Sequence, residues 1–196
     1  MLRHSGGIYY ICGSFLKWSF TMDTQKKIAL NMGLLLGLTL TLLLTILYVM
    51  DLNLFTKSWV GIVNVGIITV FGVLAAVQYK KTLGGFITYK ESFTSFFIAV
   101  LIGFLISTLF NIVLFNVIDV EAKTILSENV IKYTVEMMQK FGAKAADINK
   151  VVEDMRASDS FGVAGQLKGF FFNVIFYSII GLVCSLIIKR VPPQSL

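Results

Sequence analysis

Four long runs of apolar residues alternate with shorter polar segments along the chain. They cover about residues 28–50, 58–78, 93–118 and 167–188, and Lys168 at the edge of the last run is their only charged residue. Each run is long enough to cross a bilayer as an α-helix, which takes roughly 20 residues. The pattern predicts an all-α integral membrane four-helix bundle.

Small and hydroxyl-bearing residues recur every four positions within three of these runs. Residues four apart share one helix face, and a small face lets a second backbone come close in lipid. We therefore interpret these faces as helix-packing surfaces, with a polar groove that uses Asn111 as a ligand as the alternative. The packing candidates are Gly33, Gly37, Thr41, Ala99, Gly103, Ser107, Asn111, Gly169, Asn173 and Gly181.

The second run, 58–78, has a less regular pattern of small residues. Asn64 is its one internal amide before the end of the run, and we expect it to hydrogen-bond to a neighbouring helix. Trp59 and Tyr79 flank the run, where amphipathic rings commonly lie at the level of the headgroups.

A turn and a helix start are encoded before the third run. Gly84 and Gly85 are suited to a tight turn with positive φ. Thr88 and Glu91 have the T-x-x-E spacing of a capping box, in which each side chain satisfies a free backbone N–H of the other residue. These four residues are the loop and capping candidates.

The segment between the third and fourth runs is polar and amphipathic. Residues 119–166 carry six basic and eight acidic side chains, and their apolar residues are spaced by three and four. This period predicts two extramembrane helices, at about residues 120–141 and 145–157, with Gly142 between them. Their apolar face can pack as a hairpin, which we favour, lie on the bilayer surface, or bind another protein.

The two ends of the chain differ from the membrane domain. We interpret residues 1–21 as an N-terminal extension, Met22 as the native start, 22–190 as the four-span domain and 191–196 as a C-terminal tail. Lysines precede the first run, and basic residues also occupy the 79–92 loop and follow the last run. Because cytoplasmic loops are enriched in Lys and Arg, both termini are expected in the cytoplasm.

Composition and chemistry narrow the function further. The chain is 56% hydrophobic and 14% charged, with a net charge of +6 that we assign to membrane orientation and headgroups, not to nucleic acid. It has one histidine, two cysteines and no familiar catalytic motif. We therefore expect no enzyme activity, catalytic residue, cofactor or metal site.

Three stretches resemble a bacterial family of four-span membrane proteins known as domain of unknown function 4199. They are the basic start MDTQKKIALNMGLLLGL, the loop KKTLGGFITYKESF and the run LISTLFN, and the helical insertion before the last span adds to the likeness. The resemblance covers about residues 22–190 and implies four spans, a bacterial inner-membrane location and a start at Met22. Residues 1–21 depart from the family pattern, and no activity is transferred.

Two functions remain open at this level. The first is a non-catalytic membrane protein that acts through helix–helix assembly, as a homo-oligomer, or through a protein partner on residues 119–157. The alternative is a small transporter or channel component with an uncharged polar path along Asn64, Asn111, Asn116 and Asn173. The lipid bilayer is the expected surrounding in both.

Overall fold

The computed structural model describes the backbone of residues 6–190 and the side chains of residues 24–190. In this part of the chain the regular structure is helical, apart from one isolated antiparallel bridge between Ile87 and Arg190. The elements are α1 (Gly6–Met50), the 3-10 helix η1 (Leu52–Thr56), α2 (Ser58–Thr82), α3 (Tyr89–Val113), the π-helix η2 (Leu114–Ile118), α4 (Val120–Lys140), α5 (Ala145–Ala157) and α6 (Val163–Ile188). The predicted all-α class is confirmed.

Four helical segments are long and apolar enough to cross a membrane. They are Thr24–Met50 within α1, Ser58–Thr82, Tyr89–Ile118 across α3 and η2, and Val163–Ile188. The four-span architecture is thus confirmed, and the chain is a multi-pass membrane protein. Each span is longer than predicted, because the polar residues that flank the apolar runs are helical too.

The first helix begins before the predicted span. α1 runs without a break from Gly6 to Met50, so residues 6–21 of the predicted extension are helical and continuous with the first span. No proline interrupts this stretch, and lysine and glutamine continue a helix readily. The predicted tail, 191–196, lies outside the described residues, as do residues 1–5.

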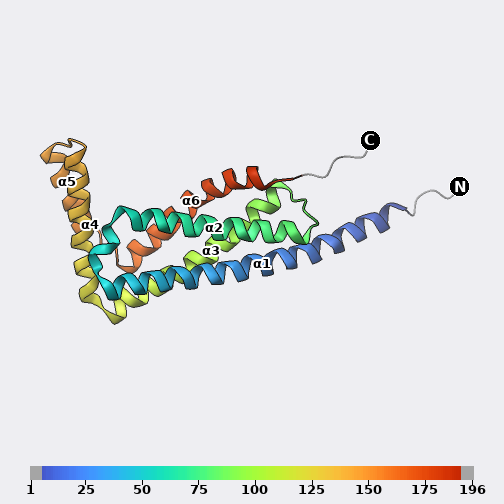
Figure 1. The fold of residues 1–196 in the computed structure, drawn as a ribbon, viewed down its shortest axis with the longest axis horizontal. Helices are drawn as coiled ribbons and strands as arrows, with labels where there is room; N and C mark the ends of the chain where they lie inside the picture. The colour runs from blue at the N-terminus through green and yellow to red at the C-terminus, as the bar shows by residue number, and fades with distance from the viewer. Residues whose placement is uncertain (1–5, 191–196) are drawn as a thin grey trace.

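Helix α3 is the central helix of the bundle, and it packs against α1, α2 and α6 (Figure 1). Phe96 of α3 is 1% exposed and lies between two glycines of its neighbours, Gly72 of α2 and Gly181 of α6. The missing side chains of these glycines make room for the ring. The buried core around it consists of Leu36, Leu40, Ile68, Phe96, Val100 and Tyr177.

The contact between α1 and α3 is close because glycines lie on both helices. A Cβ on Gly33 would lie 2.8 Å from the carbonyl oxygen of Ala99, and one on Gly103 would lie 2.5 Å from Cδ2 of Leu36. Gly37 faces Ile106 in the same way. Small residues therefore let two spans of the same chain pack closely. In lipid this matters because helices associate mainly through van der Waals contacts, which need a close approach.

One end of the bundle, here called the turn end, holds the loop between α2 and α3. Gly84 and Gly85 have φ angles of +72° and +93°, which glycine adopts without strain. Thr88 caps α3, with Glu91 N–H donating to the Thr88 hydroxyl and Thr88 N–H donating to the Glu91 carboxylate. The bridge between Ile87 and Arg190 ties the loop to the end of α6.

Two side chains at the turn end are buried within the protein. Tyr79, near the end of the second span, is 1% exposed, so its ring packs in the protein core instead of facing the surroundings. The cause is the return of α3, which covers this face of α2. Gln25 is also buried, and its amide donates to the Glu91 carbonyl at 2.8 Å and to the Ser95 hydroxyl at 2.9 Å.

The opposite end, here called the hairpin end, carries α4 and α5. The two helices stand across the ends of the spans and not along them (Figure 1). Asp119 begins α4 by accepting a hydrogen bond from the N–H of Ala122, and Gly142, with φ +72°, lies in the turn that follows α4. α5 packs on α4, and neither helix lies among the spans.

Candidate functional site

A cavity of about 430 Å³ lies inside the bundle at the hairpin end. All four spans contribute to its wall, together with Phe55 of η1 and the segment before α6. Its position follows from the packing, since the glycine-mediated contacts that bring the helices together lie nearer the turn end. The lining includes Leu40, Leu44, Asn64, Phe104, Ser107, Thr108, Asn111, Ser160, Phe161, Gln166, Asn173 and Tyr177.

Amides and hydroxyls supply the polar part of this lining. Asn64 comes from α2, Asn111 from α3, and Gln166 and Asn173 from α6. None of the residues that line the cavity is acidic, basic, histidine or cysteine. The cavity thus offers hydrogen bonds without an ion or a proton-transfer group.

The asparagines keep unused hydrogen-bonding capacity. Asn111 donates from Nδ2 to the Ser107 carbonyl at 2.8 Å, and Asn173 donates from Nδ2 to the Gly169 carbonyl at 2.9 Å. Each bond stays within one helix turn and leaves the side-chain oxygen free. Asn64 makes no side-chain hydrogen bond within the described residues, so the interhelical bond expected for it is absent there.

Apolar and aromatic groups form the rest of the wall. The rings of Phe104 and Tyr177 are tilted against each other with centroids 5.1 Å apart, which closes the cavity toward the core. Leucines of α1 line another side. A pocket that combines apolar walls with a few converging polar groups is the usual form of a small-molecule site.

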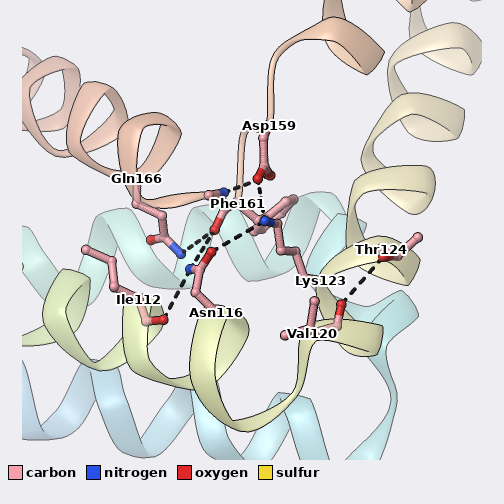
Figure 2. A network of polar contacts seen from close by, with 9 residues as sticks. Ile112, Asn116, Val120, Lys123, Thr124, Asp159, Phe161 and Gln166 are labelled. Atoms are coloured by element: carbon pink, nitrogen blue, oxygen red, sulfur yellow. Dashed lines mark hydrogen bonds and ion pairs between the residues drawn. The ribbon is translucent and has the colours of Figure 1, made fainter.

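A polar network lies next to the cavity at the hairpin end and includes Phe161 and Gln166 of its lining (Figure 2). Asn116 donates to the carbonyl oxygens of Ile112 and Phe161, both at 3.1 Å. Lys123 of α4 forms an ion pair with Asp159 and also donates to the side-chain oxygen of Asn116 at 3.4 Å. This network fastens the segment before α6 to the corner between α3 and α4.

The π-helix η2 supplies that corner. It begins at Leu114, three residues after Asn111, and contains Phe115 and Asn116. The wider turn of a π-helix shifts the residues that follow it around the helix axis, and such turns are frequent at functional sites. Phe115, 1% exposed, packs edge-on against Phe161 at 5.9 Å between centroids, beneath the polar network.

The structure separates the predicted packing residues into two groups. Gly33, Gly37, Ala99, Gly103 and Gly181 lie in close helix contacts nearer the turn end. The cavity is lined instead by the remaining α3 and α6 candidates, which are Ser107, Asn111, Gly169 and Asn173. A stripe of small residues thus continues from a contact into a hollow.

The other predicted residues lie elsewhere. The hydroxyl of Thr41 is buried without a hydrogen-bond partner among the described residues. Gly84, Gly85, Thr88 and Glu91 form the turn and helix cap at the far end of the bundle from the cavity. No group of three or more potential metal ligands occurs within the residues that the structure describes.

Sequence reasoning missed Gln166 and the role of Asn116. Gln166 lies one turn into α6, and its sequence position is that of an ordinary polar residue near a helix start. Asn116 is expected along a polar path, but it does not line the cavity. It donates a hydrogen bond to the Phe161 carbonyl next to the cavity. The signal that could have found both is their position at the ends of two spans that meet.

Comparison with known proteins identifies the family of this chain. No match was found among curated proteins or among solved structures. A family model does match, over residues 31–190, which covers most of the first span, the other three spans and the α4–α5 hairpin. The chain belongs to the family described as "Protein of unknown function (DUF4199)".

Proposed function

We propose that this chain is a non-catalytic protein of the bacterial inner membrane that carries small uncharged polar molecules, as a transporter or channel component. The observation that carries the proposal is the cavity between the spans, lined by the unpaired amide of Asn64 and the free side-chain oxygens of Asn111 and Asn173. This corresponds to the transport alternative drawn from the sequence.

The physical argument starts from the cost of unpaired polar groups. An amide without a hydrogen-bond partner in an apolar medium costs several kcal/mol, so Asn64 favours water or a polar guest in the cavity. The free oxygens of Asn111 and Asn173 can accept hydrogen bonds from the same guest. The lining has no charge that could balance an ion. An uncharged solute with hydroxyl or amide groups fits both conditions.

The orientation proposed from the sequence is supported by compact basic clusters at the turn end, whereas the six basic residues of 119–166 are spread among eight acidic ones. Lys80 donates to the Ile188 carbonyl at 2.8 Å, and Arg190 pairs with Ile87, so both lie there. Lys26 and Lys27 follow Gln25, which is anchored to Glu91 at the same end. The positive-inside rule then favours a cytoplasmic turn end, in line with the cytoplasmic termini expected from the sequence.

The test is solute flux into vesicles that contain the purified full-length protein. Glycerol and erythritol serve as uncharged probes, and stopped-flow light scattering follows vesicle swelling. We expect faster uptake than in protein-free vesicles, and a roughly tenfold loss of this excess in Asn111→Leu, the equivalent of one or two hydrogen bonds. Both probes entering at the protein-free rate would contradict the proposal.

The matched control is Asn31→Leu. Asn31 is an exposed asparagine of the first span and does not line the cavity, so the same chemical change there should leave flux intact. An equal loss in both variants would assign the effect to the fold and not to the cavity.

Assembly with a protein partner is the second candidate. Phe141 at the tip of the hairpin is 83% exposed, and α5 has no buried residue, which favours a partner on residues 119–157. Homo-oligomer formation has less support, because α1 and α3 use their glycines inside one chain. Crosslinking in native membranes, with mass spectrometry of the attached peptides, separates these outcomes.

A further inference from the structure

A second hollow lies on the outside of the bundle, where α4 crosses the beginning of α2. Figure 1 shows α4 standing across this end of the spans. The groove has a volume of about 540 Å³ and runs from Lys57 and Ser58 along α2 to Val65, with Val130 and Tyr133 of α4 as its roof. It shares Phe55 and Gly61 with the cavity wall but opens on the other side of α2.

The groove has a polar end. The Ser58 and Tyr133 hydroxyls lie 3.1 Å apart, so one donates to the other and one proton remains for a further acceptor. Lys57 is the single charged residue of the lining. Its ammonium group makes no ion pair or hydrogen bond within the described part of the chain.

The rest of the groove is apolar and faces the surrounding lipid. Ile62 is 73% exposed and Val65 is 39% exposed on the outer side of a membrane span. Gly61 lies between these two residues and the polar end of the groove. Its missing side chain leaves open space there, because no neighbouring atom lies within 4 Å of the position that a Cβ would take. Trp59, 52% exposed beside Ser58, indicates that this level is the membrane–water interface.

We propose that this groove binds one anionic phospholipid of the surrounding bilayer. Its phosphate would accept hydrogen bonds from Lys57 and from the Ser58–Tyr133 pair, while an acyl chain would lie along Gly61, Ile62 and Val65 beneath α4. The two parts of the groove match the two parts of a phospholipid. The cation and the hydrogen-bond donors lie at the membrane–water interface, where the phosphate is, and the apolar part extends into the hydrocarbon, where the acyl chains are. This inference does not rest on solute transport through the cavity.

The experiment measures lipid binding to the delipidated full-length protein in detergent. Native mass spectrometry is used to titrate phosphatidylglycerol and, separately, phosphatidylcholine. We expect one phosphatidylglycerol to bind more tightly than phosphatidylcholine. Lys57→Gln should weaken phosphatidylglycerol binding about tenfold, the effect of losing one charge-assisted hydrogen bond. Phosphatidylcholine binding should weaken less, because the choline cation beside its phosphate already offsets the attraction of Lys57.

Two matched controls separate the groove from general lipid contact. Lys132→Gln removes an exposed positive charge of α4 outside the groove, and it should leave binding unchanged. Val65→Phe fills the groove and should weaken both lipids, whereas Val63→Phe makes the same change on α2 at a residue that is also 39% exposed but outside it.

Each contrary result overturns the proposal. If Lys132→Gln costs as much as Lys57→Gln, the lipid responds to overall charge and not to this groove. If Val63→Phe weakens binding as much as Val65→Phe, the lipid is an ordinary neighbour of the bundle. Equal affinity of the wild type for the two lipids would remove the role of the cation.

Discussion

Gly33 shows how much the packing of these helices depends on glycine, whose side chain is a single hydrogen atom. A Cβ there would lie 2.8 Å from the carbonyl oxygen of Ala99. A backbone oxygen cannot rotate away, so α1 would have to move outward from α3. We expect Gly33→Ala to lower the free energy of unfolding by about 1–3 kcal/mol, the usual cost of overpacking, as measured by thermal unfolding in detergent.

Gly66 provides the comparison for that prediction. It lies in the middle of α2 with no atom within 4 Å of a Cβ position. Gly66→Ala should therefore leave stability unchanged or raise it by up to about 1 kcal/mol, because alanine favours a helix more than glycine. Equal unfolding temperatures for the two variants would mean that α1 and α3 are not in tight contact at Gly33.

At the scale of elements, Asp119 joins the end of α1 to the start of α4 at the hairpin end. Its carboxylate accepts hydrogen bonds from the Tyr48 hydroxyl of α1 at 2.6 Å and from the Ala122 N–H of α4 at 2.8 Å. The Tyr48 hydroxyl first, and the Ala122 N–H second, hold the pKa of Asp119 below its ordinary value of 3.8. The charged form is thus the one that fastens α4 to the end of α1.

This carboxylate makes stability depend on acid. Because its folded-state pKa is lower than its unfolded one, its contribution is complete above the unfolded pKa and is lost as the pH falls through the folded pKa. We expect Asp119→Asn to reduce the fall in unfolding temperature between about pH 5 and pH 2. Asp147→Asn, at an exposed carboxylate of α5, should keep the wild-type acid limb, and identical curves for all three proteins would contradict the assignment.

The same elements show what local sequence can and cannot encode. α4 and α5 were predicted nearly to the residue, since apolar spacing and Gly142 are local signals. Local signals do not predict the burial of Tyr79. They also do not predict that Phe96 packs between Gly72 and Gly181. Both depend on which faces of distant helices meet, and a single sequence carries no record of that pairing.

The cavity escaped prediction for a related reason. Spacing by four identifies the small face of α3 from Ser95 to Asn111, but it cannot tell where that face touches a neighbour and where it lines a gap. The difference arises because the contacts of Gly33, Gly37 and Gly103 lie toward one end of the bundle. The π-helix at the other end has no clear sequence signal.

For the whole molecule, orientation decides which compartment the cavity and the lipid groove face. Both lie at the hairpin end, while the basic residues Lys80 and Arg190 gather at the turn end. Lysine and arginine are retained on the cytoplasmic side during insertion. We therefore expect the hairpin end, with α4 and α5, to face away from the cytoplasm.

Cysteine labelling in spheroplasts tests this orientation. In a background with Cys12 and Cys184 replaced by serine, Lys150→Cys in α5 should react with a membrane-impermeant maleimide, because its position is exposed. Lys81→Cys, exposed at the turn end, should react only after the membrane is permeabilised. The reverse pattern would turn the bundle over, so that the cavity and the groove faced the cytoplasm. The proposed groove lipid would then come from the inner leaflet, and the basic cluster at the turn end would need another explanation.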